Sequence, residues 1–297
     1  MRYSLPKNKK NILIFGSGGF IGRHLASSLE KEYNVYKVDS VIYGPKGEDK
    51  LVIDLKNLNK VKKSFKDFGN KHKVYCFIHL ASRLVSPDKM EDFSVFFDNL
   101  RITQSVGEIA KLLSPHKIIN FSSIAVYANK SGVYREDSEI KPSVNNDCLY
   151  GLSKFCSENI LDFMLRNTGT IITHLRVAQV CGVGMRKDRI MPIMEKELAE
   201  KNTITVYGNG KRVSNFISVK DLSAKVVLFV KKDIPGVFNV GGENLSYFNL
   251  AKKIIAIKGS SDSRIKLIKS GSKEKFILDT DRFDKLRCNL ELRGNLE

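Results

Sequence analysis

"NILIFGSGGFIGRHL", residues 11–25, joins a short apolar run to a cluster of glycines and then to a helical pattern. Gly16, Gly19 and Gly22 recur at every third position, where a strand would end and a helix would begin. A tight turn at such a junction brings the backbone close to a bound phosphate, and the helix N-terminus presents N–H groups and a partial positive charge. The stretch therefore predicts a site for the pyrophosphate of a dinucleotide.

The rest of the first half of the chain alternates between two hydrophobic periods. Short apolar runs predict buried parallel strands at 33–39, 50–55, 73–81, 117–123 and 171–180. Helical patterns lie near 20–31, 57–68, 91–113 and 148–167. Strands that alternate with helices indicate βαβ units, so we predict an α/β fold with a doubly wound, Rossmann-like parallel sheet.

The pattern changes after about residue 180, where the helices and strands become shorter. Helical patterns at 190–202, 218–232, 246–257 and 279–287 alternate with extended runs at 203–208, 236–242 and 264–269. We predict a dinucleotide-binding domain over 1–180, which also receives about 214–240, and a smaller C-terminal α/β domain over 181–297 that mainly binds the substrate.

Composition and charge disfavour two classes of function. The 297 residues carry a formal net charge of +18, but the lysines are spread along the chain and mixed with acids. No long basic block, zinc-ligand spacing or RNP-like aromatic motif accompanies them, so nucleic acid is not the predicted partner. No apolar run approaches the roughly 18–20 residues that span a bilayer, so a membrane is not predicted either.

The chain start and the cysteines indicate the compartment. The apolar run after the basic start "MRYSLPKNKK" is only about four residues long, shorter than the roughly 7–15 of a secretory signal. The five cysteines are odd in number and have no metal-like spacing, which is typical of reduced thiols. We therefore predict a cytoplasmic protein with no bound metal.

A carboxylate at the end of the second predicted strand distinguishes between two dinucleotides. Asp39 closes the run 33–39, and no arginine stands beside it. A carboxylate at this position can accept hydrogen bonds from the adenosine ribose and would repel a 2′-phosphate. NAD is therefore the predicted cofactor, in preference to NADP.

Polar side chains at the sheet edge predict the chemistry. Tyr150 and Lys154 are four residues apart in a helical pattern and share a face, so the ammonium can lower the phenol pKa from its ordinary value of about 10. The tyrosinate would then act as a general base near neutral pH. The run 117–123 delivers Ser122 and Ser123 to the carboxyl edge of the sheet, where open α/β sheets bind ligands.

These features in this order resemble the extended branch of the short-chain dehydrogenase/reductase superfamily. Within that branch the chain is similar to the NAD-dependent sugar epimerases and dehydratases of the UDP-galactose 4-epimerase type. The resemblance covers nearly the whole chain. The segments that carry it are "GSGGFIG" (16–22), "FIHLAS" (77–82), "DNLRITQSV" (98–106), "FSSIAVYA" (121–128), "LRVAQVCGVG" (175–184), "NGKRVSNFISVKDL" (209–222) and "FNVGG" (238–242).

The resemblance implies a site residue by residue. It makes Ser123, Tyr150 and Lys154 catalytic. The cofactor-binding residues that it implies are Gly16, Gly19, Phe20, Ile21, Gly22, Asp39, Asp54, Leu55, Leu80, Ala81, Ser82, Asn99, Ser122, Tyr150, Lys154 and Val177. The substrate-binding residues that it implies are Ser123, Tyr150, Gln179, Arg189, Arg212 and Lys269. It also implies a homodimer formed through the helices near 91–113 and 148–167.

Departures from the family pattern narrow the expected reaction. Sugar 4,6-dehydratases place an Asp-Glu pair just after the catalytic hydroxyl residue to move protons during loss of water. This chain has Ile124 and Ala125 there, so dehydration is not expected. The cysteine that is typical of the GDP-fucose-synthase type is also absent from this stretch.

The substrate half departs from the family as well. Ser214 and Asn215 stand where the family usually has Arg-Asp, so an expected arginine for a diphosphate is missing. Arg212 is the candidate to replace it, and Lys269 is the candidate for a second phosphate-binding arginine. Gln179 occupies the place of the family's usual Asn.

The leading hypothesis is an NAD-dependent epimerase that acts on a nucleotide-activated sugar. A sugar dehydrogenase or 4-keto-reductase of the same family is the first alternative, and a non-catalytic NAD-binding protein is the second. The Ser123, Tyr150 and Lys154 set favours an enzyme, because a protein that only binds NAD needs no tyrosine base.

Overall fold

The computed structural model describes residues 9–41, 47–84 and 90–294. Residues 1–8 of the basic start lie outside the described residues. Tertiary contacts divide the chain into two units. The first comprises the chain up to Ala128, Ile140–Arg176 and Ser223–Phe238, and the second comprises Asn129–Glu139, Val177–Leu222 and the residues from Asn239 onward.

The first unit is built on a seven-stranded sheet with the strand order β11-β7-β5-β4-β1-β2-β3. Strand β1 pairs in parallel with both β2 and β4, so the order reverses between β1 and β4. This confirms the predicted doubly wound fold, in which ligands bind at the carboxyl ends of the strands beside the reversal. The strands are β1 (Asn11–Phe15), β2 (Asn34–Asp39), β3 (Lys50–Val52), β4 (Val74–His79), β5 (Lys117–Ser123), β7 (Ile171–Val177) and β11 (Gly236–Val240).

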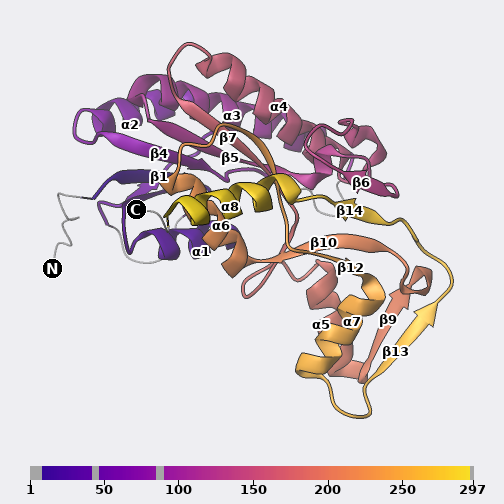
Figure 1. Cartoon of the computed structure of the whole chain (residues 1–297). Coiled ribbons are helices and arrows are strands. Elements are labelled where there is room, and N and C mark those ends of the chain that lie inside the picture. Colours follow the sequence, from indigo (N-terminus) through magenta and orange to yellow (C-terminus); the bar gives the residue numbers. More distant parts are fainter. Residues whose placement is uncertain (1–8, 42–46, 85–89, 295–297) are drawn as a thin grey trace. The chain divides into compact units, whose positions relative to one another are not determined.

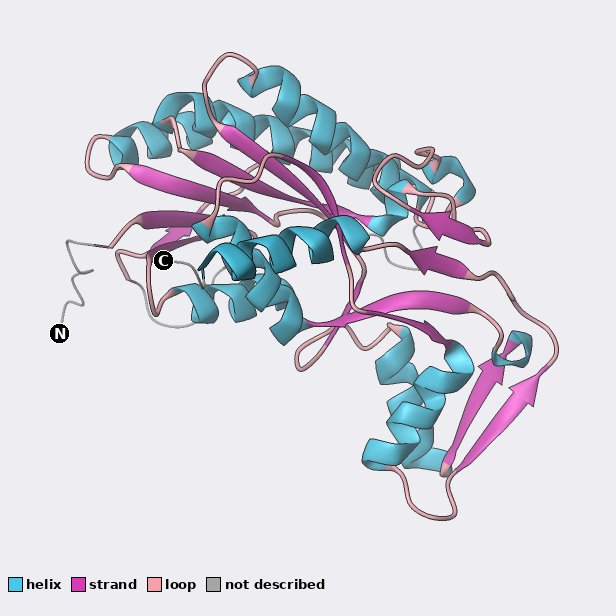
Figure 2. Cartoon of the chain, in the orientation of Figure 1, coloured by secondary structure: helices cyan, strands magenta, loops and turns pink. Residues whose placement is uncertain are grey.

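Helices cover both faces of this sheet (Figures 1 and 2). Helices α2, α3 and α4 lie on one face, and α1 and α6 lie on the other. The helices are α1 (Phe20–Leu29), α2 (Leu58–Gly69), α3 (Phe93–Leu113), α4 (Cys148–Leu165) and α6 (Val219–Lys231). Because the central strands β1, β4 and β5 are covered on both sides, they are buried along nearly their whole length, as their apolar sequences predicted.

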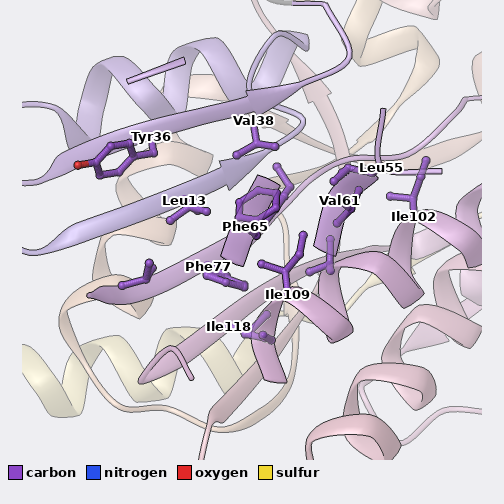
Figure 3. Close-up of a cluster of buried hydrophobic side chains, with 14 of the residues drawn as sticks. Leu13, Tyr36, Val38, Leu55, Val61, Phe65, Phe77, Ile102, Ile109 and Ile118 are labelled. Atoms are coloured by element: carbon purple, nitrogen blue, oxygen red, sulfur yellow. The ribbon is translucent and has the colours of Figure 1, made fainter. Parts of the chain in front are cut away.

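The core between the sheet and helices α2 and α3 is built from aromatic and branched side chains (Figure 3). Phe65 from α2 and Ile109 from α3 are buried against Leu13 and Phe77 of the sheet. Phe77 meets Phe15 edge to face, with ring centroids 5.1 Å apart. Burial of such side chains contributes roughly 1.5–3 kcal/mol each. The packing fixes the strand ends, and with them the edge at which the candidate site lies.

The second unit contains three smaller sheets and three helices among the described residues. Helices α5 (Ile190–Lys201) and α7 (Tyr247–Lys258) share a core with the parallel pair β9 (Thr203–Tyr207) and β13 (Arg264–Ile268). The other elements are the three-stranded sheet of β8 (Gln179–Cys181), β10 (Val213–Ser218) and β12 (Glu243–Ser246), the pair β6 (Gly132–Tyr134) and β14 (Phe276–Leu278), and α8 (Asp281–Gly294). No helix in the described part of the chain combines the length and the apolar character needed to cross a bilayer.

Candidate active site

The glycine turn after β1 is packed too closely for side chains. Gly16 has a φ of +87°, and a Cβ on it would lie 2.6 Å from the backbone nitrogen of Ala81. A Cβ on Gly22 would lie 2.3 Å from the carbonyl oxygen of Gly16. Both contacts are with backbone, which cannot move aside as a flexible side chain could. The turn therefore lies directly against the segment that follows β4.

The turn opens into the N-terminus of α1, which no side chain caps. Gly19 is the N-cap residue and is extended, with φ −70° and ψ 171°, and it offers no side-chain acceptor to the helix. Phe20 and Ile21 follow in the first helical turn and are half-buried. Uncapped N–H groups and the helix dipole suit a phosphate. The five predicted residues of this stretch are thus continuous, from the tight turn at Gly16 to the uncapped first turn of α1.

Two carboxylates mark the ends of the neighbouring strands. Asp39, at the end of β2, accepts hydrogen bonds from the backbone nitrogens of Gly18 at 2.9 Å and Ser40 at 2.7 Å. Asp54, just after β3, accepts one from the backbone nitrogen of Lys56 at 3.0 Å. Leu55 beside it is 5% exposed and belongs to the core. Asp39 therefore adjoins the glycine turn.

A pocket of about 380 Å³ opens beside Asp54. Its lining is strongly polar and comes from the start of α2 and the middle of α3. The lining residues are Asp54, Lys56, Asn57, Leu58, Asn59, Asp98 and Arg101. The pocket adjoins the carboxyl end of β3, on the same edge of the sheet as the glycine turn.

Tyr150 and Lys154 lie on one face of α4, as their spacing predicted. The Lys154 Nζ lies 5.7 Å from the centroid of the Tyr150 ring and donates a hydrogen bond to the carbonyl oxygen of Phe121 at 2.8 Å. Lys154 is only 4% exposed, and burial lowers its pKa to about 8. The cation is therefore fixed between the tyrosine and strand β5.

Ser123 lies at the point where α4 meets the end of β5. Its Oγ accepts a hydrogen bond from the backbone nitrogen of Ala125 at 3.1 Å and so caps the short 3-10 helix Ile124–Val126. Gly151, the residue after Tyr150, packs against this helix, because a Cβ on it would lie 2.1 Å from the carbonyl oxygen of Ala125. Ser123, Tyr150 and Lys154 are thus gathered at the carboxyl end of β5.

His79, at the end of β4, contributes no charge to this region. It is 1% exposed and stands edge to face with Phe15 at 6.5 Å between ring centroids. Burial, with a smaller effect from the charge of Lys154, lowers the pKa of His79 to about 3. The imidazole is therefore neutral at physiological pH.

The sequence did not single out a buried ion pair that supports the site. Glu158 of α4 accepts hydrogen bonds from Arg176 of β7, with one oxygen at 2.8 Å from Nη2 and the other at 3.1 Å from Nε. Glu158 also accepts one from the Ser122 hydroxyl, and Arg176 donates to the Tyr127 hydroxyl at 3.0 Å. Burial opposes the charge of Arg176, but the hydrogen bonds with Glu158 outweigh it and raise its pKa.

This pair joins α4, the helix that carries Tyr150, to β7, and the hydrogen bond from Ser122 joins the same helix to β5, the strand that carries Ser123. One signal in the sequence could have found it, because Glu158 lies four residues after Lys154 on the same helical face. An arginine inside an apolar strand also demands a buried acid as its partner. Loss of one member of such a pair commonly costs about 3–5 kcal/mol.

Asn99 and the segment 80–82 meet near the same edge. Leu80, Ala81 and Ser82 follow β4 and are half-buried, and the Leu80 backbone nitrogen donates to the Phe15 carbonyl oxygen at 2.9 Å. Asn99 of α3 is 4% exposed and binds both backbone groups of the next residue, Arg83. The segment that follows β4 is thereby bonded to β1 at one end and to α3 at the other.

The remaining predicted residues fall in the second unit. Gln179 donates a hydrogen bond from Nε2 to the Ser214 hydroxyl at 2.7 Å, so these two polar residues satisfy each other. The Arg212 guanidinium lies over the Tyr247 ring, 5.1 Å from its centroid. Arg189 is the exposed N-cap residue of α5, and Lys269 is exposed just after β13. Val177 closes β7 and is 6% exposed.

Two further observations concern metals and thiols. Across residues 9–41, 47–84 and 90–294, no group of three or more His, Cys, Asp or Glu side chains is arranged to hold a metal ion. The described cysteines are all free thiols.

Comparisons with known proteins agree with this geometry. Residues 12–241 match the model of the NAD dependent epimerase/dehydratase family. The chain is 26% identical over 272 residues to a dTDP-D-glucose 4,6-dehydratase of Dictyostelium discoideum, a match that covers 84% of this chain and 62% of that protein. It is 26% identical over 280 residues to a UDP-glucose 4-epimerase of Mycoplasma genitalium, covering 83% and 82% of the two chains.

A solved structure shares the fold at low identity. The chain is similar to a UDP-N-acetylglucosamine 4-epimerase from Methanobrevibacter ruminantium M1, with a TM-score of 0.80, 22% identity and coverage of 94% of this chain and 92% of that one. The Rossmann-like fold and the resemblance that the motifs predicted are thus confirmed. Since the family model spans well over half of its residues, the chain belongs to the NAD dependent epimerase/dehydratase family, and NAD is its cofactor.

Proposed function

We propose that the chain is an epimerase that inverts one carbon of a nucleotide-activated sugar. The observation that carries the proposal is the arrangement of Tyr150 and Lys154 on α4, with the buried ammonium 5.7 Å from the phenol ring. A cation at this position favours the tyrosinate, which can take the proton of a sugar hydroxyl. When bound, NAD accepts a hydride from the substrate and returns it.

The protein side chains divide the remaining tasks. Ser123 holds the reacting oxygen by a hydrogen bond and stabilises the charge that develops there. Lys154 keeps Tyr150 acidic and binds the ribose next to the nicotinamide. Tyr150 returns its proton to the same oxygen once the hydride has come back on the other face. The cycle is redox-neutral, so no free NADH accumulates.

The residues beside Ser123 favour epimerisation over dehydration. Loss of water needs an acid to protonate the leaving hydroxyl. Ile124 and Ala125 follow Ser123 and are apolar, and the carboxylate of Glu158 is occupied by Arg176 and Ser122. A net reductase would consume a reduced cofactor, and Asp39 disfavours the NADPH that supplies most cellular reductions.

For the substrate we propose four side chains of the second unit. Arg212 is half-buried and held over Tyr247, which suits it for a diphosphate oxygen. Arg189 and Lys269 are further cationic ligands, and Gln179 binds the sugar. A nucleotide diphosphate sugar would satisfy these cations with its own negative charges.

We also propose that two copies of the chain associate through α3 and α4. Phe93 and Phe97 lie one turn apart on α3 and are 60% and 52% exposed, and Phe163 on α4 is 67% exposed. Large apolar side chains exposed on adjacent helices are typical of a protein interface.

The test of the function follows product stereochemistry and reduced nicotinamide together. The purified chain is supplied with NAD and UDP-glucose, UDP-N-acetylglucosamine or UDP-glucuronic acid in turn. We expect an epimerised product without net change in NADH. Stoichiometric formation or consumption of NADH would instead support a dehydrogenase or a reductase, and an unsaturated or 4-keto-6-deoxy product would support a dehydratase.

Tyr150→Phe is the matched control for that assay. We expect turnover to fall by about 10²–10⁴-fold, because the phenol oxygen is the base while the ring supplies the packing. NAD affinity and melting temperature should stay close to wild type. A loss below tenfold would remove Tyr150 from the mechanism. Absence of turnover in the wild type, with NAD still bound, would leave the non-catalytic NAD-binding protein as the better description.

A further inference from the structure

A buried amide connects the segment after β4 with helix α4. Asn99 Oδ1 accepts a hydrogen bond from the Arg83 backbone nitrogen at 2.7 Å. Its Nδ2 donates to the Arg83 carbonyl oxygen at 3.1 Å and to the Ser153 hydroxyl at 3.0 Å. Both amide hydrogens and the amide oxygen are therefore engaged. Since Asn99 is 4% exposed, these bonds form away from water and their loss is costly.

Ser153 extends this connection to the first turn of α4. It is 1% exposed, and its Oγ donates a hydrogen bond to the Tyr150 carbonyl oxygen at 2.7 Å. A helical serine often bonds its own backbone one turn back. Here the same oxygen also accepts from Asn99, so the position of Tyr150 is tied to α3 as well as to α4.

The other end of the connection is an ion pair. The Arg83 Nη1 lies 2.6 Å from Oδ2 of Asp98, whose side chain is 12% exposed. Asp98 and Asn99 are consecutive on α3, so one holds the side chain of Arg83 and the other holds its backbone. We name residues 80–83 the cofactor loop, and its last residue, Arg83, is the one that Asp98 and Asn99 hold. Ala81 of the same loop packs against Gly16 of the glycine turn.

We propose that Asp98, Asn99 and Ser153 are positioning residues that keep the cofactor loop and Tyr150 at a fixed spacing. The inference rests on the proposed function for the role of Tyr150. Hydride and proton transfer need reacting atoms about 3–3.5 Å apart, so the segments that hold NAD and the base must not drift relative to each other. The hydrogen bonds of Asn99 and Ser153 keep the two segments at a constant distance. Asp98 holds the last residue of the cofactor loop, Arg83, through its ion pair.

If Ser153 had only a structural role, its loss would lower stability without a specific effect on NAD affinity. Buried polar groups need hydrogen-bond partners wherever they lie, and their loss then affects only stability. Ser157 offers a matched comparison, because it is on the same helix, is 2% exposed and donates from Oγ to Asn120 Oδ1 at 3.1 Å. That bond leads to β5 rather than to the cofactor loop.

The experiment compares Ser153→Ala with Ser157→Ala, using NAD alone as the probe. We expect both variants to lose a similar amount of melting temperature. Calorimetric titration should show NAD affinity weakened three- to tenfold in Ser153→Ala and within twofold of wild type in Ser157→Ala. Ser153→Thr, which keeps the hydroxyl, should recover most of the affinity.

A double-mutant cycle on NAD affinity tests the connection itself. Asp98→Asn and Ser153→Ala should combine non-additively by threefold or more, because either change already breaks the same chain of bonds. Asp98→Asn and Ser157→Ala should combine within about twofold, as independent positions do.

The outcomes separate this inference from the proposed function. If Ser153→Ala binds NAD as Ser157→Ala does and its cycle with Asp98→Asn is additive, the positioning role is overturned, whether or not the chain epimerises a sugar. If the wild type binds NAD but turns over no nucleotide sugar, the proposed function fails, and the NAD cycle still decides the inference. With an active enzyme, Ser153→Ala should also lower kcat at least tenfold at saturating NAD.

Discussion

The buried ammonium of Lys154 lowers the stability of the fold, and it also has a proposed role in lowering the pKa of Tyr150. Its ammonium is 4% exposed, has one hydrogen bond to the Phe121 carbonyl oxygen and lies next to the Tyr150 ring. Burial without a carboxylate partner disfavours the charged form, which is why its pKa falls to about 8. The same unneutralised charge is what a tyrosinate needs nearby. Burial of Lys154 therefore lowers the free energy of unfolding, while its charge favours the tyrosinate form of Tyr150.

This cost has a pH dependence with a definite sign. Lys154 has a folded pKa of about 8 against an ordinary 10.5, so between these values the unfolded chain binds more protons at this site. Stability then rises with pH. We expect the free energy of unfolding of the cofactor-free wild type, relative to Lys154→Met, to increase from about pH 8 to 10.5 in denaturant titrations. A difference between wild type and Lys154→Met that does not change with pH would contradict this expectation.

We expect another single residue, Asp39, to select NAD over NADP. Its carboxylate adjoins the glycine turn through the Gly18 backbone nitrogen, where a 2′-phosphate would meet its negative charge. Asp39→Ala should therefore narrow the preference for NAD over NADP, measured as the ratio of the two dissociation constants. Asp54→Asn is the control, and it should change both affinities by a similar factor. Equal binding of the two cofactors by the wild type would count against Asp39 as the selector.

Among the secondary-structure elements, α4 carries the largest share of the candidate site. Its first turn carries Tyr150, its second carries Lys154, and its third carries Glu158, which binds Arg176 of β7 and Ser122 of β5. Polar pairs of this kind have one geometry, whereas apolar contacts tolerate sliding. The register between α4 and β5, and hence between Tyr150 and Ser123, is set by these pairs.

Gly151 provides a test of that register. A Cβ there meets the backbone of Ala125 at 2.1 Å, so Gly151→Ala must push α4 away from the 3-10 helix. We expect a loss of about 1–3 kcal/mol of stability from overpacking, together with weaker NAD binding and lower turnover. Stability would be measured by urea titration and binding by calorimetry.

Gly107→Ala is the matched control, because it is also a helical glycine at a helix contact. Its Cβ would meet the Met164 sulfur at 2.6 Å, at the far end of a flexible side chain. Helix propensity favours alanine over glycine by about 1 kcal/mol, so this variant should be nearly neutral. If Gly107→Ala proved as damaging as Gly151→Ala, overpacking in general would explain both.

The sequence predicted the elements of the first unit well because their signals are long or repeated. Helices α3 and α4 begin and end within two residues of the predicted limits. It did not predict β6, β12 and β14, which are three or four residues long and too short to show a period of two. It also did not predict the six-residue β10, in which three of the six residues are polar. The apolar run 171–180 is broken in the structure, because β7 ends at Val177 and a new strand begins at Gln179.

In the candidate site, too, local features were predictable from the sequence and features that depend on tertiary packing were not. Motif spacing predicted that Tyr150 and Lys154 share a face, since that depends on the helix alone. It could not predict that Asn99 would bind Ser153 and Arg83, because those bonds depend on how α3 and α4 pack against each other. The cofactor and catalytic roles of the predicted residues remain proposals for the experiments above.

At the scale of the whole molecule, exposed apolar surface predicts the oligomeric state. Phe97→Asp would place a charge on the α3 surface, and we expect it to convert a dimer into a monomer by light scattering after size exclusion. Ile257→Asp is the control, because Ile257 is 79% exposed on α7, outside the proposed interface. A wild type that is monomeric at micromolar concentration, or a Phe97→Asp variant that stays dimeric, would rule out this interface.

The order of strands also bears on how the chain folds as it is synthesised. Strand β11 borders β7 in the seven-stranded sheet, yet it is synthesised only after β8, β9 and β10. At about 5–20 residues per second, the outer edge of β7 stays unpaired for several seconds during translation. An open edge of this kind can pair with another nascent chain. The late return of β11 therefore defines an interval of synthesis in which the edge of β7 is open to pairing with other chains.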